Sequence, residues 1–323
     1  MAFDLARIET IVVDSVALLR SVIGEVMTLR TDTPSLFIDL EGYQLGRHGS
    51  ISVMTIYAPP KEKVYLVDIH RLGADAFSTV NVDGKSLKSI LESSVILKVF
   101  FDIRHDSDAL FSHYSIAIGG ARDVQLMELG TRTGSKDFLA SLAECVEKDS
   151  TISAKEKKTW EMTKLNTRRL YDPALGGRYE IFNDRPIKPE IVKYCVGDVA
   201  LLPGLFIAYN TKLCRPGEKF WEVQILEATK KRIQLSQSPN FDGTSQANAR
   251  GPWTREAIEE AINQWNDDIM DNAMNEEGSD FDFDFEPIFH DFDDDDDDDW
   301  HDDGPTSCRD IIPDCDYHYY YSD

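Results

Sequence analysis

The sequence lacks the features that mark several common classes of protein. Its five cysteines show no CxxC or Cys/His spacing and its seven histidines form no metal set, so we expect neither disulfides nor zinc, and a reducing compartment. The nucleotide-binding patterns GxxxxGKS/T and GxGxxG are missing. No segment reaches the roughly 18 uncharged apolar residues of a membrane span, and MAFDLARIET does not resemble a signal peptide. We expect a soluble, intracellular protein, with nucleus or cytoplasm left open.

Basic residues are fewer than acidic ones, and nearly all of this imbalance lies in the C-terminal part of the chain. Lysine and arginine number 34 against 58 aspartates and glutamates, for a formal charge of −24. Residues 267–323 hold 23 of these acids and a single base, whereas residues 1–266 hold 33 bases and 35 acids. The nearly neutral part can therefore present a basic groove to a polyanion. Seven consecutive aspartates repel one another, which predicts a disordered acidic tail over residues 272–323 that either solubilises the chain or binds a basic protein partner.

The pattern of apolar residues is typical of one α/β domain. At 42% hydrophobic residues the chain can bury a sizeable core, and no repeat of about 20–50 residues is visible. An apolar stripe at residues 7–28 predicts an N-terminal helix within residues 1–30. Runs rich in β-branched residues predict strands at Ser35–Leu40, Ser50–Tyr57, Lys63–Ile69 and Val95–Phe101. Helical patterns lie at Ser86–Glu92, Asp106–His113, Phe138–Glu147 and Ile191–Leu213.

The apolar periodicity also predicts where the domain ends. We expect the domain over residues 31–235, followed by a linker at 236–252, where the periodicity stops. A short helix is possible over residues 253–271, with its apolar side against the domain. The residues on that side are Trp253, Ile258, Ile262, Trp265 and Ile269.

Asp39 and Glu41 are the first residues that indicate chemistry. They lie two positions apart on the first predicted strand, and the period of a strand points both side chains to the same face. Two like charges on a central strand become tolerable when a divalent cation sits between them, because Mg²⁺ and Mn²⁺ prefer hard oxygen ligands. The alternative is that both carboxylates face solvent.

A second acidic group follows the strand at residues 95–101. Asp102, Asp106 and Asp108 flank a strand-to-helix junction, where an aspartate can cap the helix, and we expect that role for Asp102. Asp106 precedes Leu110 by one helical turn, so it can lie at the inner edge of a helix whose Leu110 is in the core.

The third group is Tyr194 and Asp198, whose spacing of four places a phenol and a carboxylate on one face of a late helix. By itself this spacing is common and usually structural. Its significance comes from its combination with the two earlier groups.

Together, Asp39-x-Glu41, the later Asp106 and Tyr194-x-x-x-Asp198 resemble the DEDDy class of 3′–5′ exonucleases, which includes ribonuclease D and the exonuclease domain of the Werner helicase. The resemblance covers roughly residues 33–213. The stretches RHGSISVMTIYAPPKEKVYLVDIH, KVFFDIRHDSDALFSHYSI and DVQLMELGTR are similar to eukaryotic proteins that contain a 3′–5′ exonuclease domain. The resemblance implies a ribonuclease H-like mixed sheet flanked by helices, and hydrolysis of RNA or DNA single strands from the 3′ end.

Carried over residue by residue, the resemblance implies that two Mg²⁺ or Mn²⁺ ions are held by Asp39, Glu41, Asp106 and Asp198. It implies that Tyr194 orients the attacking water. Phe101, where relatives often have histidine, departs from the family pattern, as does the Arg104-His105 pair, and both leave the choice between RNA and DNA open. The alternative function is a catalytically weak nucleic-acid-binding or scaffold protein, which the loss of a carboxylate would favour; none is lost.

Basic residues gather between the second and third motifs. They favour either a groove for the phosphates of a strand or a solvated helical face, since glutamates are interspersed. These basic residues are Lys155, Lys157, Lys158, Lys164, Arg168, Arg169, Arg178, Arg185, Lys188 and Lys193. We expect Trp160 and Tyr179 to pack rather than stack on bases, and His48 to lie on the surface.

Overall fold

The computed structural model describes residues 8–31 and 33–275. From position 276 onward the acidic tail lies outside the described residues, and with it the predictions that the tail is disordered and that it binds a basic protein partner. Residues 272–275 belong to the last helix, α11 (Arg255–Asn275).

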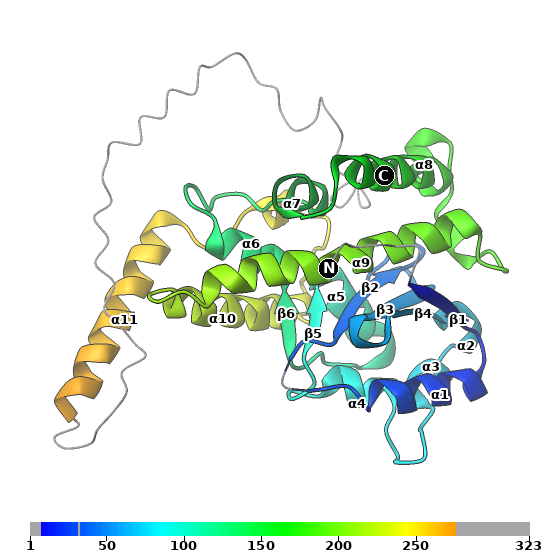
Figure 1. The fold of residues 1–323 in the computed structure, drawn as a ribbon, viewed down its shortest axis with the longest axis horizontal. Coiled ribbons are helices and arrows are strands. Elements are labelled where there is room, and N and C mark those ends of the chain that lie inside the picture. Colours follow the sequence, from blue (N-terminus) through cyan, green and yellow to red (C-terminus); the bar gives the residue numbers. More distant parts are fainter. Residues whose placement is uncertain (1–7, 32, 276–323) are drawn as a thin grey trace.

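Six strands form one mixed sheet in the order β1-β4-β3-β2-β5-β6 (Figure 1). Antiparallel pairing joins β2, β3 and β4, which confirms the predicted meander, whereas β1–β4, β2–β5 and β5–β6 are parallel. The strands are β1 (Glu9–Val13), β2 (Leu36–Glu41), β3 (Val53–Ala58), β4 (Lys63–Asp68), β5 (Lys98–Phe100) and β6 (Ala121–Asp123).

The predicted helix over residues 7–28 is wrong in its first part. Residues 9–13 form β1, which pairs along its whole length with β4 at the edge of the sheet, and the helix α1 (Val16–Val26) begins only after the N-cap Ser15. Four consecutive β-branched residues, Thr10 to Val13, favour the extended backbone. The exposed edge of β4 then supplies the hydrogen-bond partners that a strand needs.

Helices cover both faces of the sheet. The longer ones are α5 (Arg104–Tyr114), α6 (Val124–Thr131), α7 (Leu142–Asp149), α8 (Ala154–Tyr171), α9 (Pro189–Leu213) and α10 (Lys219–Ser236). The short ones are α2 (Ile69–Leu72), α3 (Asp75–Ser78) and α4 (Leu87–Glu92), with 3₁₀ turns at Pro59–Lys61, Pro173–Leu175, Tyr179–Asn183 and Gln246–Ala249.

Alternation along β2 divides the core into two layers. Leu36, Ile38 and Leu40 belong to the cluster that includes α1, α4 and α5, whereas Phe37 belongs to the cluster that includes α9. Figure 1 shows α1 and α4 on one side of the sheet and α9 on the other. Asp39 and Glu41 share the register of Phe37, so the fold directs both carboxylates toward α9.

α9 is the long apolar helix of the core. An 18-residue stretch of it has a mean hydropathy of 1.7, so length and composition alone would allow it to span a membrane. Its apolar side chains instead pack in the core cluster that also contains Phe37 of β2, with Ile191, Val199 and Leu205 fully buried. Core packing therefore accounts for the hydropathy of α9.

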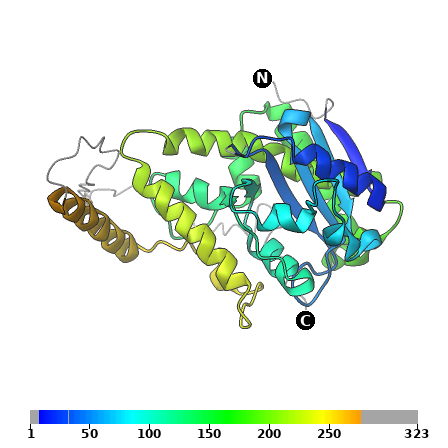
Figure 2. The same ribbon diagram turned by 90° about the horizontal axis from the view of Figure 1, so that it is seen from below.

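Residues 236–252, predicted as a linker, lie against the domain, and we call them the strap. Backbone hydrogen bonds join the strap to the loop before α7, from Leu139 N–H to the carbonyl of Ala249 and from Gly251 N–H to that of Asp137. Beyond the strap, Trp265 of α11 makes an edge contact with Phe220 of α10 at 5.7 Å. Figure 2 shows α11 at the end of the molecule far from the sheet.

Lys98 is an unusual member of the core, because its side chain on β5 is fully buried. Its ammonium group donates hydrogen bonds to the carbonyls of Ile90 and Ser93 at the C-terminal end of α4, at 3.0 and 2.7 Å. Burial lowers the pKa of Lys98 from 10.5 to about 7. Between these two pH values the unfolded chain binds a proton that the native state does not, so native stability rises with pH there.

We therefore expect the free energy of unfolding of the wild type, relative to Lys98→Met, to increase from pH 7 to pH 9. The slope can reach about 1.4 kcal/mol per pH unit, because one lysine proton is bound only in the unfolded state. Urea denaturation of both proteins across this range measures the difference, in which the other titrating groups cancel. A difference that is independent of pH would contradict the lowered pKa.

Candidate active site

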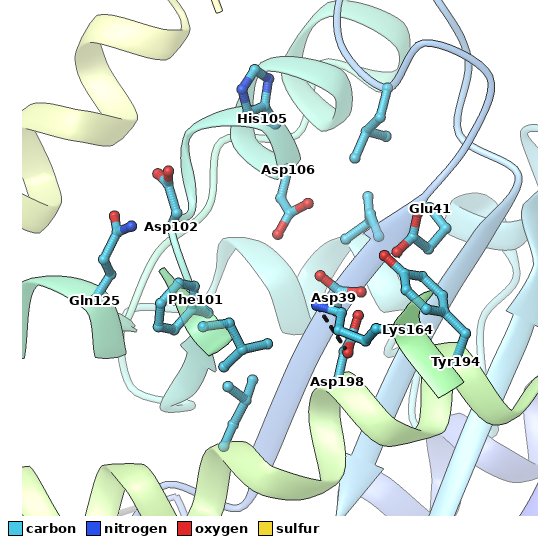
Figure 3. A pocket seen from close by; sticks show the side chains of 14 residues that line it. Asp39, Glu41, Phe101, Asp102, His105, Asp106, Gln125, Lys164, Tyr194 and Asp198 are labelled. Carbon is cyan, nitrogen blue, oxygen red and sulfur yellow. Dashed lines mark ion pairs between the residues drawn. The ribbon is translucent and has the colours of Figure 1, made fainter. Parts of the chain in front are cut away.

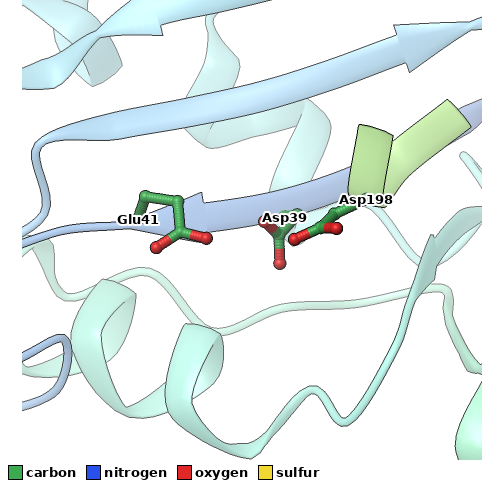
Figure 4. Close-up of side chains that lie close together, drawn as sticks. All are labelled: Asp39, Glu41 and Asp198. Carbon is green, nitrogen blue, oxygen red and sulfur yellow. The ribbon is translucent and has the colours of Figure 1, made fainter. Parts of the chain in front are cut away.

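Three carboxylates converge at the end of β2. Oxygen atoms of Asp39, Glu41 and Asp198 all lie within 4.8 Å of one another (Figure 4). Glu41 and Asp198 are buried, at 7% and 6% exposure. The two β2 residues meet Asp198 because α9 crosses the face of the sheet to which Asp39 and Glu41 point. The structure thus joins the first and third acidic groups of the sequence and rules out the solvent-facing alternative for Glu41.

Asp106 approaches the same cluster from α5. Figure 3 shows its side chain directed toward Asp39. The backbone of Leu40 on β2 donates a hydrogen bond to the Asp106 carboxylate, which ties the first turn of α5 to the strand that carries Asp39. Leu110, one turn later, is fully buried, as predicted. The second acidic group therefore also reaches the site.

Tyr194 lies one helical turn before Asp198 and faces Glu41. Its hydroxyl donates a hydrogen bond to the Glu41 carboxylate, and its ring is 3% exposed. The rings of Tyr171 and Phe182 hold it, at centroid distances of 5.9 and 6.5 Å. The hydroxyl is thus fixed at the edge of the carboxylate cluster, in a hollow of about 100 Å³.

The crowding of these groups favours protonation. Burial, then the charges of Asp39 and Asp198, raise the pKa of Glu41 well above its usual range. Burial and the charge of Asp39 likewise raise the pKa of Asp106. A divalent cation among these oxygens would reverse both effects, because it removes the repulsion and favours the ionised form. The donor set is hard oxygen only, which suits Mg²⁺ or Mn²⁺.

Lys164 is a site residue that sequence reasoning did not identify as one. The sequence placed it only among the basic residues of a possible groove, but α8 carries it into the hollow, where its ammonium lies 3.3 Å from an Asp198 oxygen. The side chain is 10% exposed. No local pattern distinguishes Lys164 from the other lysines of α8, so only the packing of α8 on α9 reveals it.

The junction between β5 and α5 is held by charges. Asp102 has φ of +52° and pairs with Arg104 through two hydrogen bonds of 2.5 and 2.6 Å, so the predicted capping role of Asp102 is wrong. Asp123, the N-cap of α6, holds the residues that precede α5, because its carboxylate accepts hydrogen bonds from the backbone N–H groups of Asp102 and Ile103. Arg232 of α10 neutralises Asp123 at 2.7 Å. Burial alone would raise the pKa of Asp102, but the charges of Arg104 and Arg232 outweigh burial and hold it well below its usual range.

A second hollow of about 380 Å³ adjoins the first. Leu45 and His105 line both hollows, and Phe241 to Thr244 of the strap form the outer wall. Burial lowers the pKa of His105 to about 4, so its imidazole is neutral at pH 7. A Cβ on Gly243 would lie 2.5 Å from the His105 ring, so only glycine lets the strap approach this closely.

The strap is anchored by two arginines beside this hollow. Arg47 donates to the carbonyls of Ser236, Ser238 and Pro239, and Arg104 donates to that of Asn248. Arg47 also pairs with Asp108, which gives this third aspartate of the α5 group a structural role. His48, at the mouth of the second hollow, is exposed, as predicted.

The ten basic residues of the predicted groove differ in their surroundings, and one of them, the half-buried Lys157, donates a hydrogen bond to the carbonyl of Glu147. Half are ion-paired within the protein: Lys164 with Asp198, Arg168 with Asp172, Arg178 and Lys188 with Asp184, and Arg185 with Asp68. Lys155, Lys158, Arg169 and Lys193 are exposed. Trp160 and Tyr179 pack in the core, as expected. Fewer charges are thus available to a strand than the sequence indicates.

Comparison with known proteins agrees with this geometry. Residues 13–213 match the family of 3′–5′ exonucleases. No curated protein matches the chain by sequence. Ribonuclease D of Trypanosoma brucei in complex with GMP superposes with a TM-score of 0.61 at 20% identity, over 80% of this chain and 73% of that one. The same enzyme with RNA U12 gives 0.60 at 18%, over 80% of both chains. Escherichia coli ribonuclease D gives 0.50 at 14%, over 72% of this chain and 51% of that one.

The ribonuclease H-like fold and the buried carboxylates define a metal-dependent nuclease. The family match covers more than half of the chain, so the protein belongs to the DEDD family of 3′–5′ exonucleases, which use divalent metal ions. It is a hydrolase that acts on the phosphodiester bonds of nucleic acid. The predicted fold class and enzyme class are therefore confirmed.

The buried pair of Asp123 and Arg232 generates a prediction about the β5–α5 junction. Asp123→Asn should destabilise the protein by about 3–5 kcal/mol, because it leaves Arg232 buried without its nearest carboxylate and weakens the hydrogen bonds to the backbone of Asp102 and Ile103. Arg232→Met should cost a similar amount, and the double variant less than the sum of the two. Chemical denaturation measures these values, with the exposed neighbour Lys231→Met as control. Additive losses would show that the two residues act independently.

Proposed function

We propose that Asp39, Glu41, Asp106 and Asp198 hold two Mg²⁺ or Mn²⁺ ions and that Tyr194 orients the water that attacks the terminal phosphodiester bond. The observation that supports this most strongly is the convergence of three carboxylates from two elements within 4.8 Å, with Asp106 directed at them from a third. Such a cluster is costly for folding unless cations offset the repulsion, so its presence favours a catalytic role.

The chain's own residues provide orientation and charge. Bound divalent ions would stabilise the negative charge on the attacking and leaving oxygens. Asp39 and Glu41 are fixed by strand pairing, Asp198 by the core packing of α9, and Asp106 by its hydrogen bond from Leu40, so little reorganisation is needed. The Tyr194 hydroxyl, held by Glu41, is positioned to hydrogen-bond a water molecule at the edge of the cluster.

We propose single-stranded RNA with a free 3′ end as the substrate. The support is the structural similarity to ribonuclease D of Trypanosoma brucei, which has been solved with RNA U12. The two adjoining hollows offer room for nucleotides beside the carboxylates. Purified protein with end-labelled RNA and DNA oligonucleotides of the same sequence, read on a sequencing gel, tests both polarity and sugar preference. If DNA were trimmed at the same rate as RNA, the proposal that RNA is the substrate would be wrong, whereas the exonuclease activity itself would stand.

The metal assignment predicts the effect of removing single ligands. Asp39→Asn or Glu41→Gln should lower trimming by about 10³-fold or more, because several kcal/mol of transition-state stabilisation depend on the ions. EDTA should abolish the wild-type activity, and Mg²⁺ or Mn²⁺ should restore it. The matched control is Glu161→Gln, an exposed glutamate on α8. If the Asp39→Asn/Glu41→Gln double variant trimmed at the rate of the uninhibited wild type, with and without EDTA, these residues would be excluded as metal ligands.

Substitution of Tyr194 should affect the enzyme differently from substitution of a metal ligand. Tyr194→Phe keeps the packed ring but removes the hydroxyl, so turnover should fall by roughly 10- to 1000-fold while metal affinity persists. Single-turnover kinetics with saturating enzyme isolate the chemical step, and calorimetric titration with Mn²⁺ measures metal binding. Unchanged single-turnover rates would assign Tyr194 to packing alone.

A further inference from the structure

Lys164 is the one buried cation among the described residues that lines the carboxylate hollow. Its ammonium nitrogen lies 3.3 Å from Asp198, 5.6 Å from the centre of the Tyr194 ring and 5.0 Å from that of Trp160 (Figure 3). None of the family motifs in the sequence includes Lys164. It contacts both members of the third motif, on an element that contributes no carboxylate to the site.

The packing of two helices fixes this position. Trp160 lies one turn before Lys164 on α8, and its indole faces Gly197 on α9, where a Cβ would lie 3.2 Å from the ring. Glycine at position 197 thus allows α8 to approach α9 closely. One turn further along α8, Lys164 then lies over the Tyr194–Asp198 pair, and its ammonium faces the rings of both Trp160 and Tyr194.

We propose that Lys164 is a positioning residue of the exonuclease, a built-in cation that holds Asp198 and Tyr194 in place and offsets one negative charge of the cluster. Four ionised carboxylates balance the charge of two divalent ions. When the ions are bound, the additional positive charge of Lys164 therefore balances the single negative charge of the scissile phosphodiester group. In the metal-free enzyme the same ammonium is ion-paired with Asp198, and it therefore opposes metal binding at that carboxylate.

This inference rests on the proposed function, and it predicts two opposite changes in one variant. Lys164→Met should bind Mn²⁺ about 3- to 30-fold more tightly, because a positive charge beside a ligand oxygen is removed. The same variant should lose about 10- to 100-fold in kcat, because Tyr194 and Asp198 are less precisely placed and the additional positive charge is gone. Lys164→Arg keeps the charge and should recover a large part of both properties.

The experiment uses the full chain without nucleic acid for metal binding and with an RNA oligonucleotide at saturating Mn²⁺ for kcat. Isothermal titration with Mn²⁺ is carried out on the wild type, Lys164→Met, Lys164→Arg and the control Lys158→Met, an exposed lysine on the same helix. Lys164→Gln provides the same comparison if the methionine variant does not fold, which the thermal melting curve reveals.

Tighter metal binding together with slower turnover, reversed by arginine, supports the proposal. Weaker metal binding with slower turnover would overturn it, because a residue that merely supports the fold would loosen the whole site. Unchanged metal affinity or unchanged kcat would also overturn it. Absence of metal-dependent trimming by the wild type would instead contradict the proposed function, and the titrations would still report whether Lys164 opposes metal binding.

Discussion

Repulsion among buried carboxylates at the end of β2 is the constraint to which the surrounding structure responds. Oxygen atoms of Asp39, Glu41 and Asp198 lie within 4.8 Å of one another, where like charges repel. Burial, together with this repulsion, raises the pKa of Glu41. Groups from separate elements offset this repulsion: a phenol from α9 bonds Glu41 and an ammonium from α8 pairs with Asp198, while a backbone N–H from β2 bonds the nearby Asp106. The arrangement is preorganised for divalent cations, at the cost of stability in their absence.

The functional unit is larger than the sequence motifs. Asp106 is placed by the β5–α5 junction, which depends on Asp123 and on Arg232 of α10, more than 100 positions later. The strap then returns over the first turns of α5, held by Arg47 and Arg104. Residues beyond the family match, which ends at 213, therefore support the geometry of the site.

Strong local patterns account for the predictions that hold. The alternation of β2 predicts that Asp39 and Glu41 share a face, and the i, i+4 spacing predicts that Tyr194 and Asp198 do. Sequence reasoning missed β6 because it is three residues long, and misread β1 because its apolar residues also fit a helical stripe. It missed α8 because that helix is rich in charge and presents few apolar residues.

Spacing along the chain is sufficient to predict the apolar periodicities of β2 and α9, the identity of the carboxylates and their assignment to an exonuclease class. Three other features become visible only in the folded chain: Asp102 pairs with Arg104 instead of capping α5, the strap packs on the domain, and Lys164 enters the carboxylate hollow. Each of these outcomes is a choice among several chemically similar partners. The choice follows from which helices pack together and how closely, since an ion pair or hydrogen bond forms only between groups that the fold has already brought within about 3 Å.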